Sequence, residues 1–187
     1  MAHRVCPVWI GYFLACPIRK IFQNPEKILG PYIRKGMTVL DIGCAMGFFS
    51  LPLARMVGAE GKVISSDIQE NMLRSLEKRA EKAGLADRIT TRLCHRDSFN
   101  LHDFKEQVDF ALAFAVVHEL PDISLFFSEI YETLKPAGRL LIAEPKGHVS
   151  EKEFEITLSV AIQKGFESAD RPRIPYSHAV ILEKEIL

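Results

Sequence analysis

Apolar and polar positions along this chain follow two different rhythms. Short runs rich in apolar residues lie at 37–43, 61–68, 88–97, 108–117 and 139–145. Between these runs the apolar residues recur at the spacing of an amphipathic helix. Short apolar runs predict buried strands, and the helical spacing predicts helices with one buried side. Strands that alternate with helices are typical of a parallel sheet covered by helices on both faces.

Capping and stop residues mark where the helices begin and end. The sequence Asn24-Pro25-Glu26 has the residues of an N-cap and first turn, and Ser150 with Glu153 forms a capping box. Glycine or proline then ends several of the helical patterns. These signals predict helices over about 24–34, 47–57, 70–84 and 122–134 and from 150 onward, followed by two late strands at 165–170 and 178–184.

Length and charge describe an ordinary single globular domain. The chain has 187 residues, and its 24 basic and 24 acidic side chains cancel. That length predicts one domain over 1–187, and the absence of a basic excess argues against nucleic acid as a partner. The apolar stretch 5–18 is too short for a membrane span, and two prolines interrupt it. We therefore expect a cytoplasmic protein without a membrane segment, either a monomer or a homodimer.

The four cysteines predict free thiols and no metal site. Cys6, Cys16, Cys44 and Cys94 form no CxxC pair and no cluster with the spacing of zinc ligands. Buried thiols in a reducing cytoplasm are the favoured interpretation. The alternative is a thiol site built from Cys6 and Cys16, which would suit a thiol or a thiophilic metalloid as acceptor.

Three aspartates come where three successive strands end. Asp41, Asp67 and Asp97 follow the first, second and third strand, and Gly43 and Gly47 come directly after the first of them. Ligands of open parallel sheets bind outside the carboxyl ends of the strands. Carboxylates there would repel a pyrophosphate, and the glycine spacing is not the GxGxxG of dinucleotide sites. A ligand with an ammonium group and ribose hydroxyls fits better, because a carboxylate accepts two hydrogen bonds side by side.

A known family shares these features. The segment "VLDIGCAMGFFS" resembles the D-x-G-x-G-x-G motif of class I S-adenosylmethionine-dependent methyltransferases. The resemblance runs from Gly36 to the C-terminus and includes "VISSDI", "CHRDS", "VDFALAFAVVHEL" and "LKPAGRLLIAEP". It implies an α/β Rossmann-like sheet of seven strands, mostly parallel, with an antiparallel last strand beside the fifth and helices on both faces.

The resemblance also implies roles for single residues. S-adenosyl-L-methionine would be the cofactor and S-adenosyl-L-homocysteine the product. The residues implied to bind it are Asp41, Gly43, Cys44 and Gly47 at the methionine part, Asp67 at the ribose with Ile68 against the adenine, Asp97 and Ser98 at the adenine edge and ring, and Ala113 at the start of the segment flanking the sulfonium.

Ala45 departs from the family pattern, which has its middle glycine there. Glycine is used where φ is positive or where the backbone approaches a ligand closely. A positive φ at Ala45 would cost about 1 kcal/mol, whereas a negative φ would cost little and the methyl group would only narrow the pocket. A cofactor-binding protein without turnover is therefore an alternative to an enzyme. A nicotinamide oxidoreductase is a further alternative.

His118 and Glu144 are the candidates for chemistry on the acceptor. They follow the fourth and fifth strands, next to the expected methyl position. A base is needed if the acceptor carries a proton to lose. The other interpretation is structural: His118 would order the loop before Pro121, and Glu144 would pair within its own loop.

The aromatic segment 1–36 could cover the core 37–187 as a lid, which favours a small-molecule acceptor. Packing of this segment on the sheet or at a dimer contact is equally expected.

Overall fold

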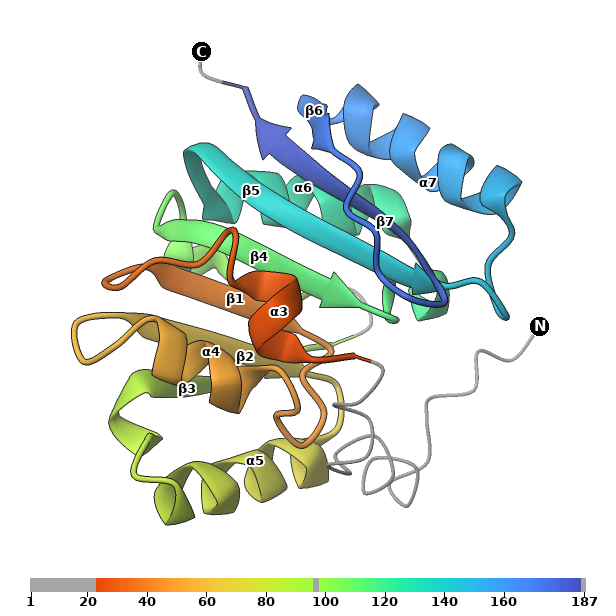
Figure 1. The fold of residues 1–187 in the computed structure, drawn as a ribbon. Coiled ribbons are helices and arrows are strands. Elements are labelled where there is room, and N and C mark those ends of the chain that lie inside the picture. The colour runs from red at the N-terminus through yellow and green to blue at the C-terminus, as the bar shows by residue number, and fades with distance from the viewer. Residues whose placement is uncertain (1–22, 96–97, 186–187) are drawn as a thin grey trace.

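The computed structural model describes residues 23–95 and 98–185. Within them the chain forms a seven-stranded sheet in the order β3-β2-β1-β4-β5-β7-β6 (Figure 1). Six strands run in one direction, and β7 is antiparallel to both of its neighbours, β5 and β6. This is the Rossmann-like methyltransferase topology that the resemblance implies, including the antiparallel strand beside the fifth.

The strands agree with the apolar runs, although their ends differ. They are β1 Thr38–Ile42, β2 Lys62–Asp67, β3 Ile89–Leu93, β4 Val108–Phe114, β5 Leu134–Pro145, β6 Phe166–Asp170 and β7 Ser177–Lys184. The central strands β1 and β4 are buried along almost their whole length, as continuous apolar runs predict for strands covered on both faces.

The helices of the described residues fall on both faces of the sheet. They are α3 Pro25–Leu29, α4 Ser50–Met56, α5 Glu70–Lys82, α6 Ile123–Thr133 and α7 Glu151–Gln163, with short 3₁₀ turns η1 Ala86–Arg88, η2 His102–Phe104 and η3 Val117–Glu119. In Figure 1, α3 and α4 lie in front of the sheet and α6 lies behind it. The capping box predicted at Ser150 and Glu153 is present at the start of α7.

Each face of the sheet carries its own apolar core. On one face Leu29, Leu53 and Leu76 of α3, α4 and α5 pack against alternate side chains of the central strands. On the other face the same strands turn their remaining side chains toward Phe126 of α6 and Phe154 of α7. This alternation follows from the two-residue period of a strand. The sheet is therefore held rigidly between two layers, which positions the loops at its edge.

Four element boundaries differ from the sequence-based expectation. The first helix ends at Leu29 rather than near residue 34, because Gly30 and Pro31 follow it. The second helix begins at Ser50, since the glycine loop extends to Phe49. The third strand ends at Leu93, so it does not include Cys94 and His95 of the predicted range. The fifth strand starts earlier than expected, at Leu134, and includes Lys135 to Gly138.

The predicted lid lies mostly outside the described residues. Residues 1–22 are not described, whereas 23–36 include α3, whose Leu29 is buried in the core. Tyr32, one of the aromatic residues of this segment, stacks on Phe110 of β4 at 5.8 Å between ring centroids. Its hydroxyl donates to Asp170 at 3.2 Å. At this end, therefore, the segment packs on the sheet.

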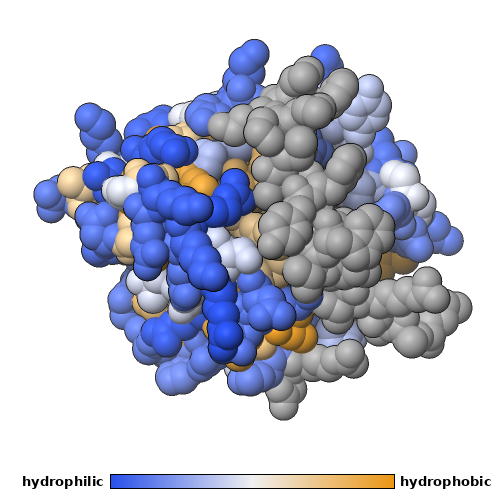
Figure 2. All heavy atoms as spheres, turned by 90° about the horizontal axis from the view of Figure 1, so that it is seen from below, coloured by the Kyte–Doolittle hydropathy of each residue, from blue (hydrophilic) through white to orange (hydrophobic). Residues whose placement is uncertain are grey.

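The outer surface beside α5 is polar. Figure 2 shows that hydrophilic residues dominate the described surface seen from this side, and α5 buries only Met72, Leu73, Leu76 and Ala80. Within 23–95 and 98–185 no helix combines the length and the apolar composition required to cross a membrane.

Candidate functional site

The loop after β1 folds back on the end of β2. The backbone N–H groups of Gly43 and Cys44 both donate to the carbonyl of Ser66, at 2.9 and 3.0 Å. Gly43 and Gly47 have φ of 67° and 83°, and a Cβ at Gly47 would lie 2.3 Å from Leu76 Cδ1. Only glycine is accommodated there without displacement of a neighbour. The glycine motif therefore shapes a tight loop at the carboxyl edge of the sheet.

Ala45 adopts the conformation of the glycine that it replaces. Its φ is 46°, which settles the question left open by the sequence. The cost of this conformation is about 1–2 kcal/mol for a residue with a Cβ. Its N–H group donates to Asp67 Oδ2 at 2.9 Å. The strained residue thus links the glycine loop to the acid at the end of β2.

Asp67 is a buried carboxylate at the edge of the sheet. It is 7 % exposed, and its Oδ1 accepts the N–H of Gln69 at 2.8 Å. Burial raises the pKa of this carboxyl, while hydrogen bonds from the backbone of Gln69 and Ala45 act in the opposite direction. Two carboxylate oxygens offer about four acceptor positions, and the backbone of Gln69, Ala45 and Ile68 takes up three of them, so about one remains available for a ligand hydroxyl.

Two exposed apolar side chains lie at the same edge. Ile68, directly after Asp67, is 39 % exposed, and Leu93, which pairs with Asp67 in the sheet, is 37 % exposed. Large apolar side chains left open beside a buried acid fit a ligand that combines a polar sugar with a planar base. The adenine contact that the resemblance implies for Ile68 stays a prediction.

Asp41 is engaged by the helix that follows the glycine loop. It is 2 % exposed, and the hydroxyl of Ser50 donates to its Oδ2 at 2.5 Å. Arg79 of α5 donates to the carbonyl of Met46 within the same loop. Cys44 is buried, and burial raises the pKa of its thiol well above the ordinary value, as the charges of Asp41 and Asp67 do further. Its thiol is therefore protonated and packs in the core.

The remaining predicted cofactor residues have different surroundings. Asp97 lies outside the described residues. The carbonyl of Ser98 accepts a hydrogen bond from the N–H of His95 at 2.7 Å, and the Oγ of Ser98 accepts one from the N–H of Asn100 at 3.0 Å. Ala113 is 0 % exposed and belongs to the apolar core behind the sheet. Its side chain therefore packs in the core, and Val116, just beyond the strand, lies against Gly43 of the glycine loop.

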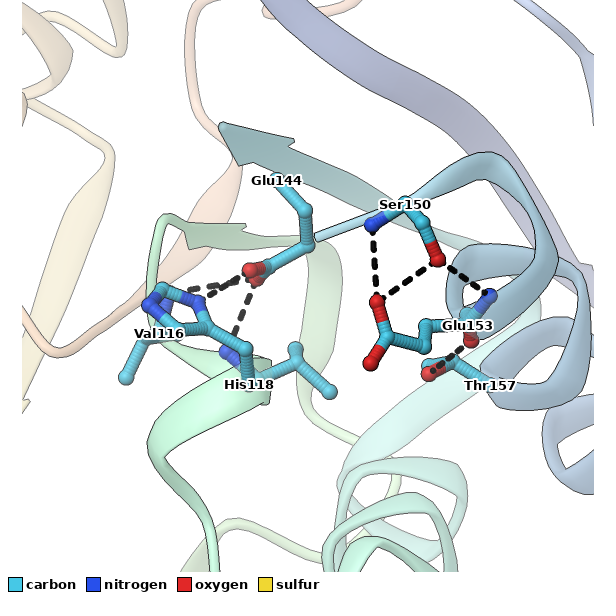
Figure 3. A network of polar contacts seen from close by, with 7 residues as sticks. Val116, His118, Glu144, Ser150, Glu153 and Thr157 are labelled. Carbon is cyan, nitrogen blue, oxygen red and sulfur yellow. Dashed lines mark hydrogen bonds and ion pairs between the residues drawn. The ribbon is translucent and has the colours of Figure 1, made fainter. Parts of the chain in front are cut away.

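Glu144 and His118 form a pair at the ends of β5 and β4 (Figure 3). Glu144 Oε2 contacts His118 Nδ1, and its Oε1 accepts the N–H groups of Val116 at 3.2 Å and Val117 at 2.9 Å. The carboxylate is 2 % exposed, whereas the imidazole is 21 % exposed. Glu144 is thus the buried partner and His118 the side chain that reaches the surface of the site.

The contact with Glu144 decides the protonation of His118. The hydrogen bond raises the pKa of the imidazole above its ordinary 6.5, and burial acts against it more weakly. His148 packs edge-on against His118 with 5.6 Å between the ring centroids. Burial also raises the pKa of the nearby Glu119 carboxyl. A histidine held by a buried carboxylate is a usual arrangement for a side chain that accepts a proton.

The loop after β4 joins these two halves of the site. Ala115 has a φ of 57°, and its N–H donates to Ala143 of β5 at 2.7 Å. A Cβ on Gly43 would lie 2.7 Å from Val116 Cγ2, so this loop contacts the glycine loop directly. Ala115 and Val116 belong to the segment that the resemblance implies beside the sulfonium, whereas Ser50 and Arg79 were not predicted from the sequence. A serine at a helix start was a usable signal for Ser50, but nothing local marks Arg79.

Among the described residues no group of histidine, cysteine or acidic side chains could hold a metal ion.

Known proteins with similar sequences are methyltransferases. A family model described as "Methyltransferase domain" matches residues 33–179. The chain is 32 % identical over 143 residues to a ubiquinone biosynthesis O-methyltransferase of Bradyrhizobium diazoefficiens. The matched residues make up 75 % of this chain and 51 % of that protein.

Two further proteins show the same relationship. A demethylmenaquinone methyltransferase of Staphylococcus aureus is 30 % identical over 112 residues, 60 % of this chain and 44 % of that protein. The chain thus spans about half the length of these relatives. The structure of a SAM-dependent methyltransferase from Aquifex aeolicus superimposes with a TM-score of 0.85 at 26 % identity, over 96 % of this chain and 99 % of the other. The chain therefore belongs to the methyltransferase-domain family, among the class I S-adenosylmethionine-dependent enzymes.

Proposed function

We propose that this protein transfers a methyl group from S-adenosylmethionine to an oxygen atom of a small molecule, with His118 as the base. The observation that carries this proposal is the pair of His118 and the buried Glu144, on the loops that adjoin the glycine loop. The cofactor supplies an electrophilic methyl group on a positively charged sulfur. The residues of the chain bind, orient and accept a proton.

In this proposal Asp67 binds a ribose hydroxyl and Ile68 lies against the adenine. Asp41, with one oxygen already bonded to Ser50, attracts the ammonium group of the methionine part. Gly43, Cys44, Ala45 and Gly47 contribute backbone at close range. A positively charged ligand is favoured here because Asp41 and Asp67 are both buried at the same edge, where an opposite charge interacts strongly.

His118 takes the proton that the acceptor loses. With Nδ1–H donating to Glu144, the lone pair of the neutral imidazole lies on Nε2. Glu144 stabilises the positive charge that forms on the ring, and its bonds to Val116 and Val117 hold the loop in place. Glu144 is accordingly a positioning residue rather than one that touches the acceptor.

The nature of the acceptor follows from the need for a base. A hydroxyl must lose a proton during methyl transfer, whereas a thiolate need not. One relative is named as an O-methyltransferase of ubiquinone biosynthesis, which supports an oxygen acceptor. The described cysteines, Cys44 and Cys94, are free and buried, and free thiols suit the reducing cytoplasm that we propose as its location. Cys6 and Cys16 of the thiol alternative lie outside the described residues.

The test is methyl transfer from labelled S-adenosylmethionine to a panel of phenols, hydroquinones, amines and thiols. We expect phenols or hydroquinones to be methylated. His118→Ala should lower kcat by about 10²–10⁴-fold, the usual contribution of a general base, while the calorimetric Kd of S-adenosylhomocysteine stays within twofold. His102→Ala, at an exposed histidine on η2, is the matched control and should retain full activity. Unchanged kcat in His118→Ala would contradict the assignment of the base.

A further inference from the structure

A second pocket lies at the end of the sheet beyond the site already described. Its volume is about 520 Å³, which is within the range of small-molecule sites. The walls come from α7, from the connection 171–176 between β6 and β7, and from the start of β7. Figure 1 shows this connection beside the carboxyl end of β5, where the N–H of Lys146 donates to the carbonyl of Tyr176 at 2.9 Å.

Positive charge is left over on the walls of this pocket. Arg171 is neutralised by Glu155, with which it makes two hydrogen bonds of 2.6 and 3.1 Å. Lys146 and Arg173 are exposed and have no acidic partner within ion-pair distance among the described residues. Glu151 is the opposing acid. Two unpaired cations against one unpaired anion favour a negatively charged ligand, and an arginine can bind a carboxylate with two parallel hydrogen bonds.

Aromatic rings also contribute to the lining of the pocket. Phe154 is buried and stacks on His178, with ring centroids 5.5 Å apart and planes at 25°. Tyr176 is 74 % exposed, so that its ring is open to a ligand. These rings favour a planar group over an aliphatic one.

The backbone of Tyr176 is strained. Its φ is 59°, which is unusual for a bulky residue. Such strain persists only where the surroundings enforce it, and it is concentrated at functional sites. The bond from the N–H of Lys146 is one contact that holds the residue in this conformation. The backbone that carries this exposed aromatic side chain is thus held in a strained conformation at the wall of the pocket.

We propose that this pocket binds a small anionic molecule with a planar ring. Lys146 and Arg173 bind the anionic group, and Tyr176 contacts the ring. The site is separate from the glycine loop, yet it adjoins the proposed active site, because Glu144 pairs with His178 and Pro145 pairs with Ser177 in the sheet. The ligand is either a separate molecule or the anionic end of the methyl acceptor.

The test is an NMR titration of the full chain, saturated with S-adenosylhomocysteine, with benzoate and with inorganic phosphate at low ionic strength. We expect saturable shifts at Phe154, Tyr176 and Ser177, with benzoate binding more tightly than phosphate. Lys146→Ala/Arg173→Ala should raise the Kd of benzoate at least about tenfold, since two charge-assisted contacts are lost. Arg55→Ala/Lys152→Ala removes the same charge from exposed positions outside the pocket, and it should change the Kd of benzoate less than twofold.

The Tyr176→Asn variant isolates the ring, because asparagine tolerates a positive φ. This variant should weaken the binding of benzoate severalfold and leave the binding of phosphate unchanged. Competition by the methyl acceptor would identify the ligand as part of that acceptor, and independent binding would identify a separate molecule. Absence of saturable shifts at the pocket, or equal weakening by the two double variants, would overturn the proposal. Since nothing here depends on turnover, a failure of the proposed methyl transfer would be recognised separately.

Discussion

Ala45 shows what one side chain costs at a position built for glycine. Its φ of 46° places the methyl group in a region that alanine seldom occupies. The bond from its N–H to Asp67 fixes the peptide group between Cys44 and Ala45. The strained residue is therefore attached directly to a carboxylate that we propose to bind the cofactor.

Substitutions at Ala45 should separate strain from chain entropy. Ala45→Gly relieves about 1–2 kcal/mol of strain but adds flexibility to the unfolded chain worth about 0.5–1 kcal/mol. We expect its free energy of unfolding in urea to lie within about 1 kcal/mol of wild type. Ala45→Val should be less stable by about 2 kcal/mol or more, because a β-branched residue is strongly disfavoured at positive φ. Equal stability of Ala45→Val and wild type would contradict the assigned conformation.

Asp67 should account for a measurable part of the cofactor affinity. Asp67→Ala should weaken S-adenosylhomocysteine by about 1–3 kcal/mol in calorimetry, from the loss of hydrogen bonds to a charged acceptor. Asp103→Ala, at an exposed acid whose partner Arg92 is on β3, is the control and should bind as wild type does. A Kd unaffected by Asp67→Ala would refute the ribose assignment.

At the scale of elements, Glu144 connects the end of β5 to η3 and thereby sets the pKa of His118. Because the raised pKa exceeds 6.5, and only neutral His118 accepts a proton, kcat/KM should fall as the pH drops through a value above 6.5. Glu144→Gln should shift this acid limb to lower pH, whereas His102→Gln should leave it in place. If the acid limb of kcat/KM lies at the same pH in Glu144→Gln and in wild type, the contact with Glu144 does not control the titration of His118.

The same contact makes a pH-dependent contribution to stability. A group whose pKa is raised on folding contributes stability that is fully present below its unfolded pKa of about 6.5 and is lost as the pH rises through the folded value. The free energy of unfolding of wild type should therefore exceed that of His118→Gln, and this difference should be larger at pH 5.5 than at pH 9. A difference that does not vary with pH would argue against the raised pKa.

The start of α7 depends on its capping box. The N–H of Ser150 donates to Glu153 at 2.8 Å, and the N–H of Glu153 donates to Ser150 Oγ at 3.3 Å. Ser150→Ala should cost about 0.5–2 kcal/mol of unfolding free energy. Ser159→Ala, in the exposed interior of the same helix, should be nearly neutral or slightly stabilising. A loss at Ser159 as large as that at Ser150 would show that the cap is not the cause.

At the scale of the whole molecule, ligand binding and folding are linked. A ligand that binds only the native chain at one hundred times its Kd adds about 2.7 kcal/mol to the unfolding free energy. S-adenosylhomocysteine should stabilise wild type by this amount in chemical denaturation. Asp67→Ala should be stabilised less at the same ligand concentration. The absence of any stabilisation by S-adenosylhomocysteine would contradict the proposed cofactor site.

The sequence predicted the elements well because their signals are local. Apolar runs located the first five strands, the two late strands were predicted at 165–170 and 178–184, and the capping box at Ser150 was confirmed. The antiparallel position of β7 came only from the family resemblance, since strand pairing joins residues far apart in the chain. The boundary at Leu134 differed because this residue pairs with Val108 of β4, which extends the strand beyond its apolar run.

The sequence by itself determined the alternation of strands and helices, the glycine loop and the acids Asp41 and Asp67 at the ends of β1 and β2, because each depends on residues close in the chain. Only the tertiary structure decided that Ala45 has a positive φ, that Ala113 belongs to the core, and that Glu144 holds His118. It also placed a charged pocket between α7 and the start of β7. These features depend on side chains from separate strands and loops, whose distances are defined only when the sheet has formed.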